Sequence, residues 1–207
     1  MKTQAYHKGN VREDLVEAAE QILQEEGLAA LSVRRVAREI GVVPSAVYNH
    51  FENREALLAA VAADGYHHLE KLVGKLEGST TEPELLLRQM ARGYLQFAAE
   101  NPNLYRLMFS AEMVAIRIHP ALEQASDSTF GRLAEWWYGP GSFDPKASAV
   151  KYPYALSIWS LMHGAAMQMI DGLVAVDMTR KPAINKLADA VVGVLIGGIR
   201  EALPKNT

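Results

Sequence analysis

Four hydrogen-bonding side chains crowd into one short segment near the amino end of the chain. Within GVVPSAVYNHFENREALL, which spans residues 41–58, the four are Ser45, Tyr48, Asn49 and His50. An asparagine amide can make paired hydrogen bonds to an adenine edge, and serine and tyrosine hydroxyls can donate to bases or phosphates. These residue types therefore suit the reading of DNA, provided that one surface presents them together.

The helical period places three of these groups on one face. At about 100° per residue, Ser45, Tyr48 and Asn49 share a polar arc, while apolar residues such as Phe51 share the other arc. We therefore expect the polar arc to face outward. His50 falls on the inward arc, where a half-buried structural histidine and a phosphate contact are both open alternatives.

The flanking residues offer positive charge. Arg34, Arg35 and Arg38 lie on one face of the preceding helical segment, where they could contact phosphates. Ser32 begins that segment, and the free N–H groups of a helix start can hold a phosphate. Arg54 lies in the first turn of the following helix and is placed to contact the DNA backbone. For phosphate contacts, the positions of the charged residues matter more than the net charge of the chain.

Helices are predicted to position all of these groups. Asn10, Ser32 and Asn53 are suitable N-caps, Gly41 suits a tight turn, and Pro44 fits the first turn of a helix. A short helix held crosswise on another after such a turn is a helix-turn-helix, whose second helix can enter a major groove. The predicted helices of this part span residues 10–27, 32–41, 44–51 and 53–76.

The remainder of the chain also has helical periodicity and no convincing alternating strand. Proline- and glycine-containing links separate the predicted helices. The sequence therefore predicts an all-α protein with a helix-turn-helix domain at residues 1–58 and a helical bundle at residues 59–207 for ligand binding and dimerisation. The predicted helices of the bundle span residues 83–101, 103–116, 120–138, 146–175 and 182–203.

Composition limits the other possibilities. The chain has 207 residues, with 49% hydrophobic and 22% charged residues, as in an ordinary soluble protein. It has no cysteine, so disulfides, thiolate metal sites and cysteine nucleophiles are excluded, and a reducing cytoplasm is the expected location. With 7 Lys and Arg against 9 Asp and Glu in residues 1–60, non-specific coating of DNA is excluded. No apolar run predicts a signal peptide or a membrane span.

The run LSVRRVAREIGVVPSAVYNHFENREALL resembles the DNA-binding segment of the tetracycline-repressor (TetR) family of transcriptional regulators. The family pattern is a capping Ser or Thr, an I-A-x-x-x-G-V turn, Y-x-H-F, and a Lys-Glu-x-Leu helix start. Here the turn is VAREIGV, Tyr-Asn-His-Phe stands at 48–51, and Arg54 occupies the lysine position. The resemblance implies DNA contacts from Ser32, Pro44, Ser45, Ala46, Tyr48, Asn49, His50 and Arg54.

The predicted helix 146–175 has two uncharged faces, so we expect both to be covered. One face contains small residues that allow close approach of another helix, and the last helix has a similar face. A four-helix dimer seam is one interpretation, and a helix buried within one monomer is the other. The predicted seam consists of Leu161, Gly164, Ala165, Gln168, Leu187, Val191, Leu195 and Gly198.

Trp159, His163 and Gly164 form a W-x-x-x-H-G pattern that resembles one C-terminal subgroup of the same family. The resemblance implies a helical regulatory domain with an internal pocket for a small molecule. Soft methionines and aromatic rings suit a broad apolar or planar ligand, although each is also an ordinary core residue. The candidate lining residues are Tyr94, Phe97, Tyr105, Met108, Phe109, Met113, Trp137, Trp159, Met162, His163 and Met167.

No cofactor or metal is expected. His67 and His68 are adjacent, so on a helix they point roughly 100° apart, and no phosphate loop, nucleophile elbow or H-E-x-x-H motif occurs. The hypothesis is therefore a homodimeric repressor that binds a palindromic operator in double-stranded DNA and releases it on binding a small-molecule effector. An activator of the same fold stays open, as do a helical enzyme using His163 and a protein-binding module.

Overall fold

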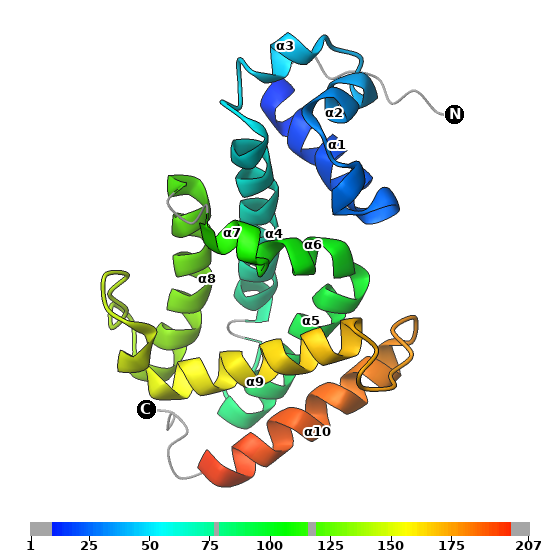
Figure 1. Ribbon diagram of the computed structural model, residues 1–207. Coiled ribbons are helices and arrows are strands. Elements are labelled where there is room, and N and C mark those ends of the chain that lie inside the picture. The colour runs from blue at the N-terminus through cyan, green and yellow to red at the C-terminus, as the bar shows by residue number, and fades with distance from the viewer. Residues whose placement is uncertain (1–9, 77–78, 116–118, 200–207) are drawn as a thin grey trace. The chain divides into compact units, whose positions relative to one another are not determined.

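The computed structural model describes residues 10–76, 79–115 and 119–199, and all regular elements in these ranges are helical (Figure 1). The all-α prediction is thus confirmed. The chain forms two compact units. The first unit holds the residues through Gly65 together with Asn103–Gln124, and the second holds Tyr66–Pro102 together with the residues from Ala125 onward. The expected boundary at residue 58 instead lies inside a continuous helix, and residues 103–124 join the amino-terminal unit.

The first unit begins with α1 (Val11–Glu26), α2 (Val33–Glu39) and α3 (Pro44–Val47), followed by the start of α4 (Arg54–Leu76). Side chains cap two of these helices. The Ser32 hydroxyl accepts from the Arg35 N–H over 3.2 Å, and the Asn53 amide oxygen accepts from the Ala56 N–H over 2.8 Å. Asn10 precedes α1, but its side chain makes no capping hydrogen bond. The four predicted helices exist, with α3 ending earlier than expected.

The turn between α2 and α3 depends on a glycine. Gly41 has φ of +75°, a left-handed conformation that a side chain would strain. The Val42 N–H reaches back to the carbonyl of Ala37 over 2.9 Å and so closes the end of α2. Val43 is extended and leads into Pro44 at the start of α3. The turn therefore fixes the direction in which α3 leaves α2.

A later segment of the chain completes the first unit. The predicted helix 103–116 is two helices, α6 (Pro102–Met108) and α7 (Ala111–Ala115), and residue 116 lies outside the described residues. The break falls at Ser110, whose hydroxyl accepts from the Met113 N–H over 3.2 Å and caps the new helix. The Asn103 amide donates to the Leu23 carbonyl over 3.0 Å, which ties α6 to the end of α1.

The second unit is built on α5 (Pro83–Glu100), α9 (Pro153–Ile170) and α10 (Lys181–Ile199), which pack against one another, together with most of α8 (Pro120–Tyr138). The helix predicted over 146–175 is shorter at both ends. It is preceded by η2 (Ala149–Lys151), and it ends before Gly172, which has φ of +71°. The end predicted for the last helix, at residues 200–203, lies outside the described residues.

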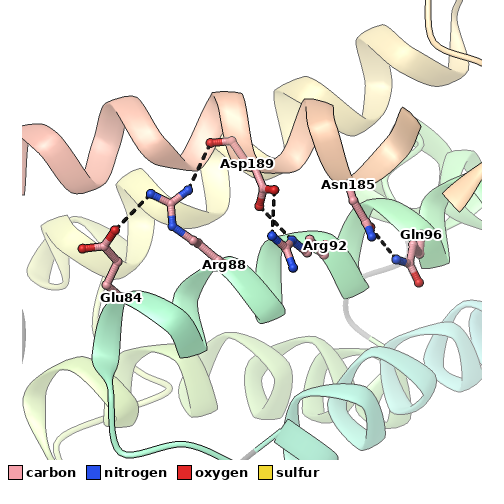
Figure 2. A network of polar contacts seen from close by, with 6 residues as sticks. All are labelled: Glu84, Arg88, Arg92, Gln96, Asn185 and Asp189. Atoms are coloured by element: carbon pink, nitrogen blue, oxygen red, sulfur yellow. Dashed lines mark hydrogen bonds and ion pairs between the residues drawn. The ribbon is translucent and has the colours of Figure 1, made fainter. Parts of the chain in front are cut away.

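A row of polar contacts joins α5 to α10, as Figure 2 shows. Arg92 donates to both carboxylate oxygens of Asp189, over 2.8 and 2.7 Å, and Gln96 donates to Asn185 over 2.6 Å. Arg88 pairs with Glu84 on its own helix over 3.0 Å. These contacts occupy one face of α10 within the chain. Any seam with a second copy must therefore use another face of that helix.

Candidate nucleic-acid interface and regulatory domain

The reading surface consists of Ser45, Tyr48 and Asn49, carried by α3 and the turn after it. All three side chains are exposed, Tyr48 at 55%, whereas Val47 and Phe51 behind them are 0% and 3% exposed. This is the orientation that the helical period predicts. Only residues 44–47 are regular α-helix, and tight turns continue the coil through backbone hydrogen bonds such as that from His50 N–H to Val47 over 3.0 Å.

The side chain of His50 is exposed as well. Its inward placement, which assumed an ideal helix through residue 51, is wrong because the helix loosens into turns after Val47. This exposure excludes the interpretation of His50 as a half-buried structural residue, and a contact between His50 and a phosphate stays a prediction. Pro44 is exposed beside the reading surface, and Ala46 is half-buried.

The three arginines of α2 differ in their surroundings. Arg34 and Arg38 are exposed. Arg35 is instead bound on two sides, by Glu26 over 2.7 Å and by Glu39 one turn further along its own helix. The two carboxylates offset the charge of the Arg35 guanidinium. We therefore expect phosphate contacts only from Arg34 and Arg38 among these three arginines.

Arg54 also has partners within the first unit. Its Nη1 donates to Glu112 of α7 over 2.8 Å, and its Nε donates to the carbonyl of Leu31 over 3.2 Å. No local pattern predicts this arrangement, because Glu112 lies 58 residues further along the chain. A contact between Arg54 and DNA stays a prediction, and the position of its guanidinium is set by these two acceptors.

The candidate ligand residues do not come together in one unit. Tyr105, Met108, Phe109 and Met113 belong to the first unit, and the other seven belong to the second. In the first unit Tyr105, Met108 and Met113 are buried, and the rings of Tyr105 and Phe109 lie 4.8 Å apart. A single pocket lined by all eleven residues is therefore not supported by either unit alone.

In the second unit the W-x-x-x-H-G residues join an aromatic cluster. The ring of Trp159 lies 5.9 Å from that of His163 and 6.0 Å from that of Phe130. Burial lowers the pKa of His163, which favours its neutral form. Of the other candidates in this unit, Tyr94, Phe97 and Met162 are buried, Trp137 and Met167 are half-buried, and the Trp137 ring stacks on that of Tyr154 at 4.7 Å.

The second unit also contains an open cleft of about 590 Å³, bordered by Glu70, Arg132, Trp136 and Phe143 among others. None of the predicted ligand residues lines it. Burial alone would raise the pKa of Glu70, but its carboxylate accepts hydrogen bonds from Ser128 and Arg132, which have the larger effect. The pKa of Glu70 is therefore lowered. The carboxylate is therefore ionised and already has partners within the chain.

The predicted dimer seam is partly exposed. On α9, Leu161 and Gln168 are exposed and Gly164 is half-buried, but Ala165 is only 8% exposed and belongs to the interior of its own chain. On α10, Gly198 is exposed, whereas Leu187, Val191 and Leu195 are half-buried. Uncharged residues thus remain accessible on both helices.

The described residues contain no group of three or more His, Asp or Glu side chains arranged to hold a metal ion. Among the helices that the structure describes, none combines the length and apolar character needed to cross a bilayer.

Two family models match the chain. Residues 15–61 match the bacterial regulatory proteins of the tetR family, and residues 87–195 match the tetracyclin repressor-like C-terminal domain. The second match alone covers more than half of the chain.

Solved structures with the same fold include a protein of unknown function from Rhodococcus sp. RHA1, at 22% identity and a TM-score of 0.72, with 99% of this chain and 100% of that chain covered. The fatty acid degradation regulator FadR from Bacillus halodurans matches at 17% identity and 0.69, with 94% and 98% covered. The ketosteroid transcriptional regulator KstR2 of Mycobacterium tuberculosis matches at 16% and 0.60, with 98% of each chain covered. The chain belongs to the TetR family of bacterial regulatory proteins and is a DNA-binding transcriptional regulator.

Proposed function

We propose that this regulator is a cytoplasmic repressor, which binds a two-fold symmetric operator as a homodimer and leaves it when a small molecule binds. The main support for the proposal is the orientation of the reading surface. Ser45, Tyr48 and Asn49 are exposed on a short element whose apolar back, Val47 and Phe51, is buried. A rigid support of this kind lowers the entropic cost of ordering side chains against a base edge.

In the proposed complex Asn49 pairs with an adenine edge in the major groove, and Tyr48 and Ser45 donate to neighbouring bases or phosphates. Arg34 and Arg38 contact phosphates and supply the salt-dependent part of the affinity. The support for this division is their exposure, since Arg35 between them is already bound to Glu26 and Glu39.

Dimerisation follows from the size of the reading surface. One short element reads only a few base pairs, whereas two related by a two-fold axis read half-sites about 34 Å apart. We place the seam on the uncharged faces of α9 and α10, with Leu161 and Gly164 on one helix and Gly198 on the other. The polar contacts between α5 and α10 leave this face of α10 available.

For the effector we propose an apolar or planar molecule bound in the second unit beside Trp159 and His163. The aromatic cluster supplies apolar and π surface. The half-buried His163, whose pKa burial lowers, supplies one neutral imidazole for a hydrogen bond. Binding would favour a conformation in which the two reading surfaces of the dimer no longer match one turn of DNA.

The experiment is a gel-shift titration on an operator selected from random duplexes, comparing Tyr48→Ala with Tyr138→Ala. Both tyrosines are exposed, but Tyr138 lies on α8 in the second unit. We expect Tyr48→Ala to weaken binding roughly tenfold or more, and Tyr138→Ala to leave it unchanged. Equal affinities for the wild type and Tyr48→Ala would contradict the proposed reading surface.

A further inference from the structure

Two large apolar residues are exposed in the first unit, and both lie in the short segment that carries the reading surface. Among the residues of this unit that the structure describes, only Val43, at 64%, and Tyr48, at 55%, are exposed large hydrophobic residues. The others of this kind belong to the second unit. Tyr48 is part of the reading surface, whereas Val43 has no contact in the proposed complex.

The turn explains why Val43 is exposed. The helical period alone places Val43 on the inward arc with Val47, but α3 begins only at Pro44. The residue before a proline is restricted to extended conformations, and Val43 has φ of −74° and ψ of 146°. Its carbonyl accepts from the Ala46 N–H over 2.9 Å, which attaches it to the first turn of α3. The backbone of Val43 is therefore held in place while its side chain stays accessible.

Local stability does not account for a valine at this position. Val43 is the N-cap residue of α3, where Ser, Thr, Asp and Asn are favoured and valine is among the poorest choices. Ser32 at the corresponding position of α2 does cap its helix, over 3.2 Å. Val43 is not a core residue either, in contrast to Val36, which is fully buried. A contact made in the complex with DNA would give this valine a role.

The chemistry of the side chain limits what it can contact. Valine presents only methyl groups and cannot hydrogen-bond to a base edge. In the major groove the base edges present hydrogen-bonding groups, apart from the C5-methyl group of thymine. We propose that Val43 contacts the C5-methyl group of a thymine in the operator and so determines part of the sequence specificity. This inference rests on the proposed function, which places the reading surface in the major groove.

The contact would add an apolar element to the hydrogen bonds proposed for Tyr48 and Asn49. Removing one methyl group from water on binding is worth about fourfold in affinity. Because valine carries no charge, replacing Val43 should leave the salt dependence of binding unchanged. This distinguishes Val43 from Arg34 and Arg38, whose proposed contacts are with phosphates.

The test uses the full chain and an operator selected from random duplexes, in which each thymine is replaced in turn by deoxyuridine, which lacks only the C5-methyl group. We expect one replacement to weaken binding by the wild type about fourfold and to leave binding by Val43→Ala nearly unchanged. An effect of deoxyuridine on the duplex itself acts on both proteins and cancels in the comparison. Val150→Ala is the matched control, since Val150 is 73% exposed in the second unit, and it should respond as the wild type does.

A second variant, Val43→Ser, separates the methyl contact from an effect on α3 itself. Serine lacks the methyl groups but is a favourable N-cap. Val43→Ser should therefore be at least as stable as the wild type in denaturant unfolding, and it should still bind the thymine and deoxyuridine operators equally well.

The outcomes also separate this inference from the proposed function. If the wild type, Val43→Ala and Val43→Ser respond equally to deoxyuridine at every thymine, or if no thymine responds, the methyl contact is overturned. The proposed reading surface then still stands if Tyr48→Ala loses binding. If Tyr48→Ala binds the operator as tightly as the wild type does, the reading surface fails, and the methyl contact fails with it.

Discussion

Arg54 and Glu112, which are 58 residues apart in the chain, form an ion pair of 2.8 Å within the first unit. Arg54 follows the reading surface directly, and Glu112 lies on α7. The same guanidinium donates to the Leu31 carbonyl just before α2. One side chain thus connects the start of α4 to α7 and to the entry of the helix-turn-helix. Arg54 therefore has a structural role whether or not it also contacts DNA.

This arrangement separates the effects of two arginines. Arg54→Ala should lower the free energy of unfolding by about 1 kcal/mol, because it removes a part-buried ion pair and a hydrogen bond to a carbonyl. Arg34→Ala, on the exposed face of α2, should leave the stability unchanged and reduce the salt dependence of DNA binding by about one phosphate contact per subunit. Denaturant unfolding and gel shifts at several salt concentrations measure the two effects. Equal stability losses in both variants would contradict this assignment.

The dimer seam is tested by placing a charge on the exposed face of α9. Leu161 is 38% exposed, and Leu161→Glu should fold normally but sediment as a monomer, because an unpaired charge in an apolar seam is costly. Val150→Glu is the control, since Val150 is 73% exposed and lies outside the seam on η2. Analytical ultracentrifugation distinguishes the two variants. A dimeric Leu161→Glu protein would move the seam to another surface.

The close packing of Gly131 against Phe143 in the second unit can be tested by substitution. A Cβ added to Gly131 of α8 would lie 2.6 Å from the ring of Phe143, whereas one added to Gly74 of α4 meets nothing closer than 3.8 Å. Alanine should gain up to about 1 kcal/mol of helix propensity at either position. At Gly131 overpacking of about 1–3 kcal/mol should exceed that gain. Thermal unfolding should therefore show Gly131→Ala less stable and Gly74→Ala at least as stable as wild type.

His163 should make the protein acid-sensitive. Burial lowers its pKa, so the folded state resists protonation while the unfolded chain accepts a proton near pH 6.5. The stability contributed by the neutral imidazole is present above about pH 6.5 and is lost as the pH falls below that value. His163→Gln should remove this part of the acid response. Unfolding of both proteins at pH 7.5 and pH 5.0 measures it, and parallel losses would show that His163 does not titrate with folding.

The sequence predicts those features of the structure that depend on residues close together in the chain. Ser32 and Asn53 cap their helices, Gly41 takes the positive φ of the turn, and Val47 and Phe51 are buried behind the polar arc. Capping, turn chemistry and helical periodicity all act over a few residues. For that reason the reading surface was predictable residue by residue.

Contacts between distant segments were not predictable. Periodicity continues smoothly through Phe109 and Ser110, so it does not predict the break between α6 and α7. It also does not predict the pairing of Glu112 with Arg54. The ideal wheel also failed at His50, because α3 ends at Val47. The candidate pocket residues are apolar, and composition cannot assign such residues to one unit or the other.

The central claim is that two copies of one small reading surface are presented together to DNA. The most direct measurement is selection of bound sequences from a random duplex pool, followed by hydroxyl-radical footprinting of the selected site. We predict two inverted half-sites whose centres are separated by about 10 base pairs, or by a multiple of one DNA turn. We also predict that an even number of subunits binds and protects the site. A single unrepeated site bound by one subunit, or a pool without any enriched sequence, would contradict the account.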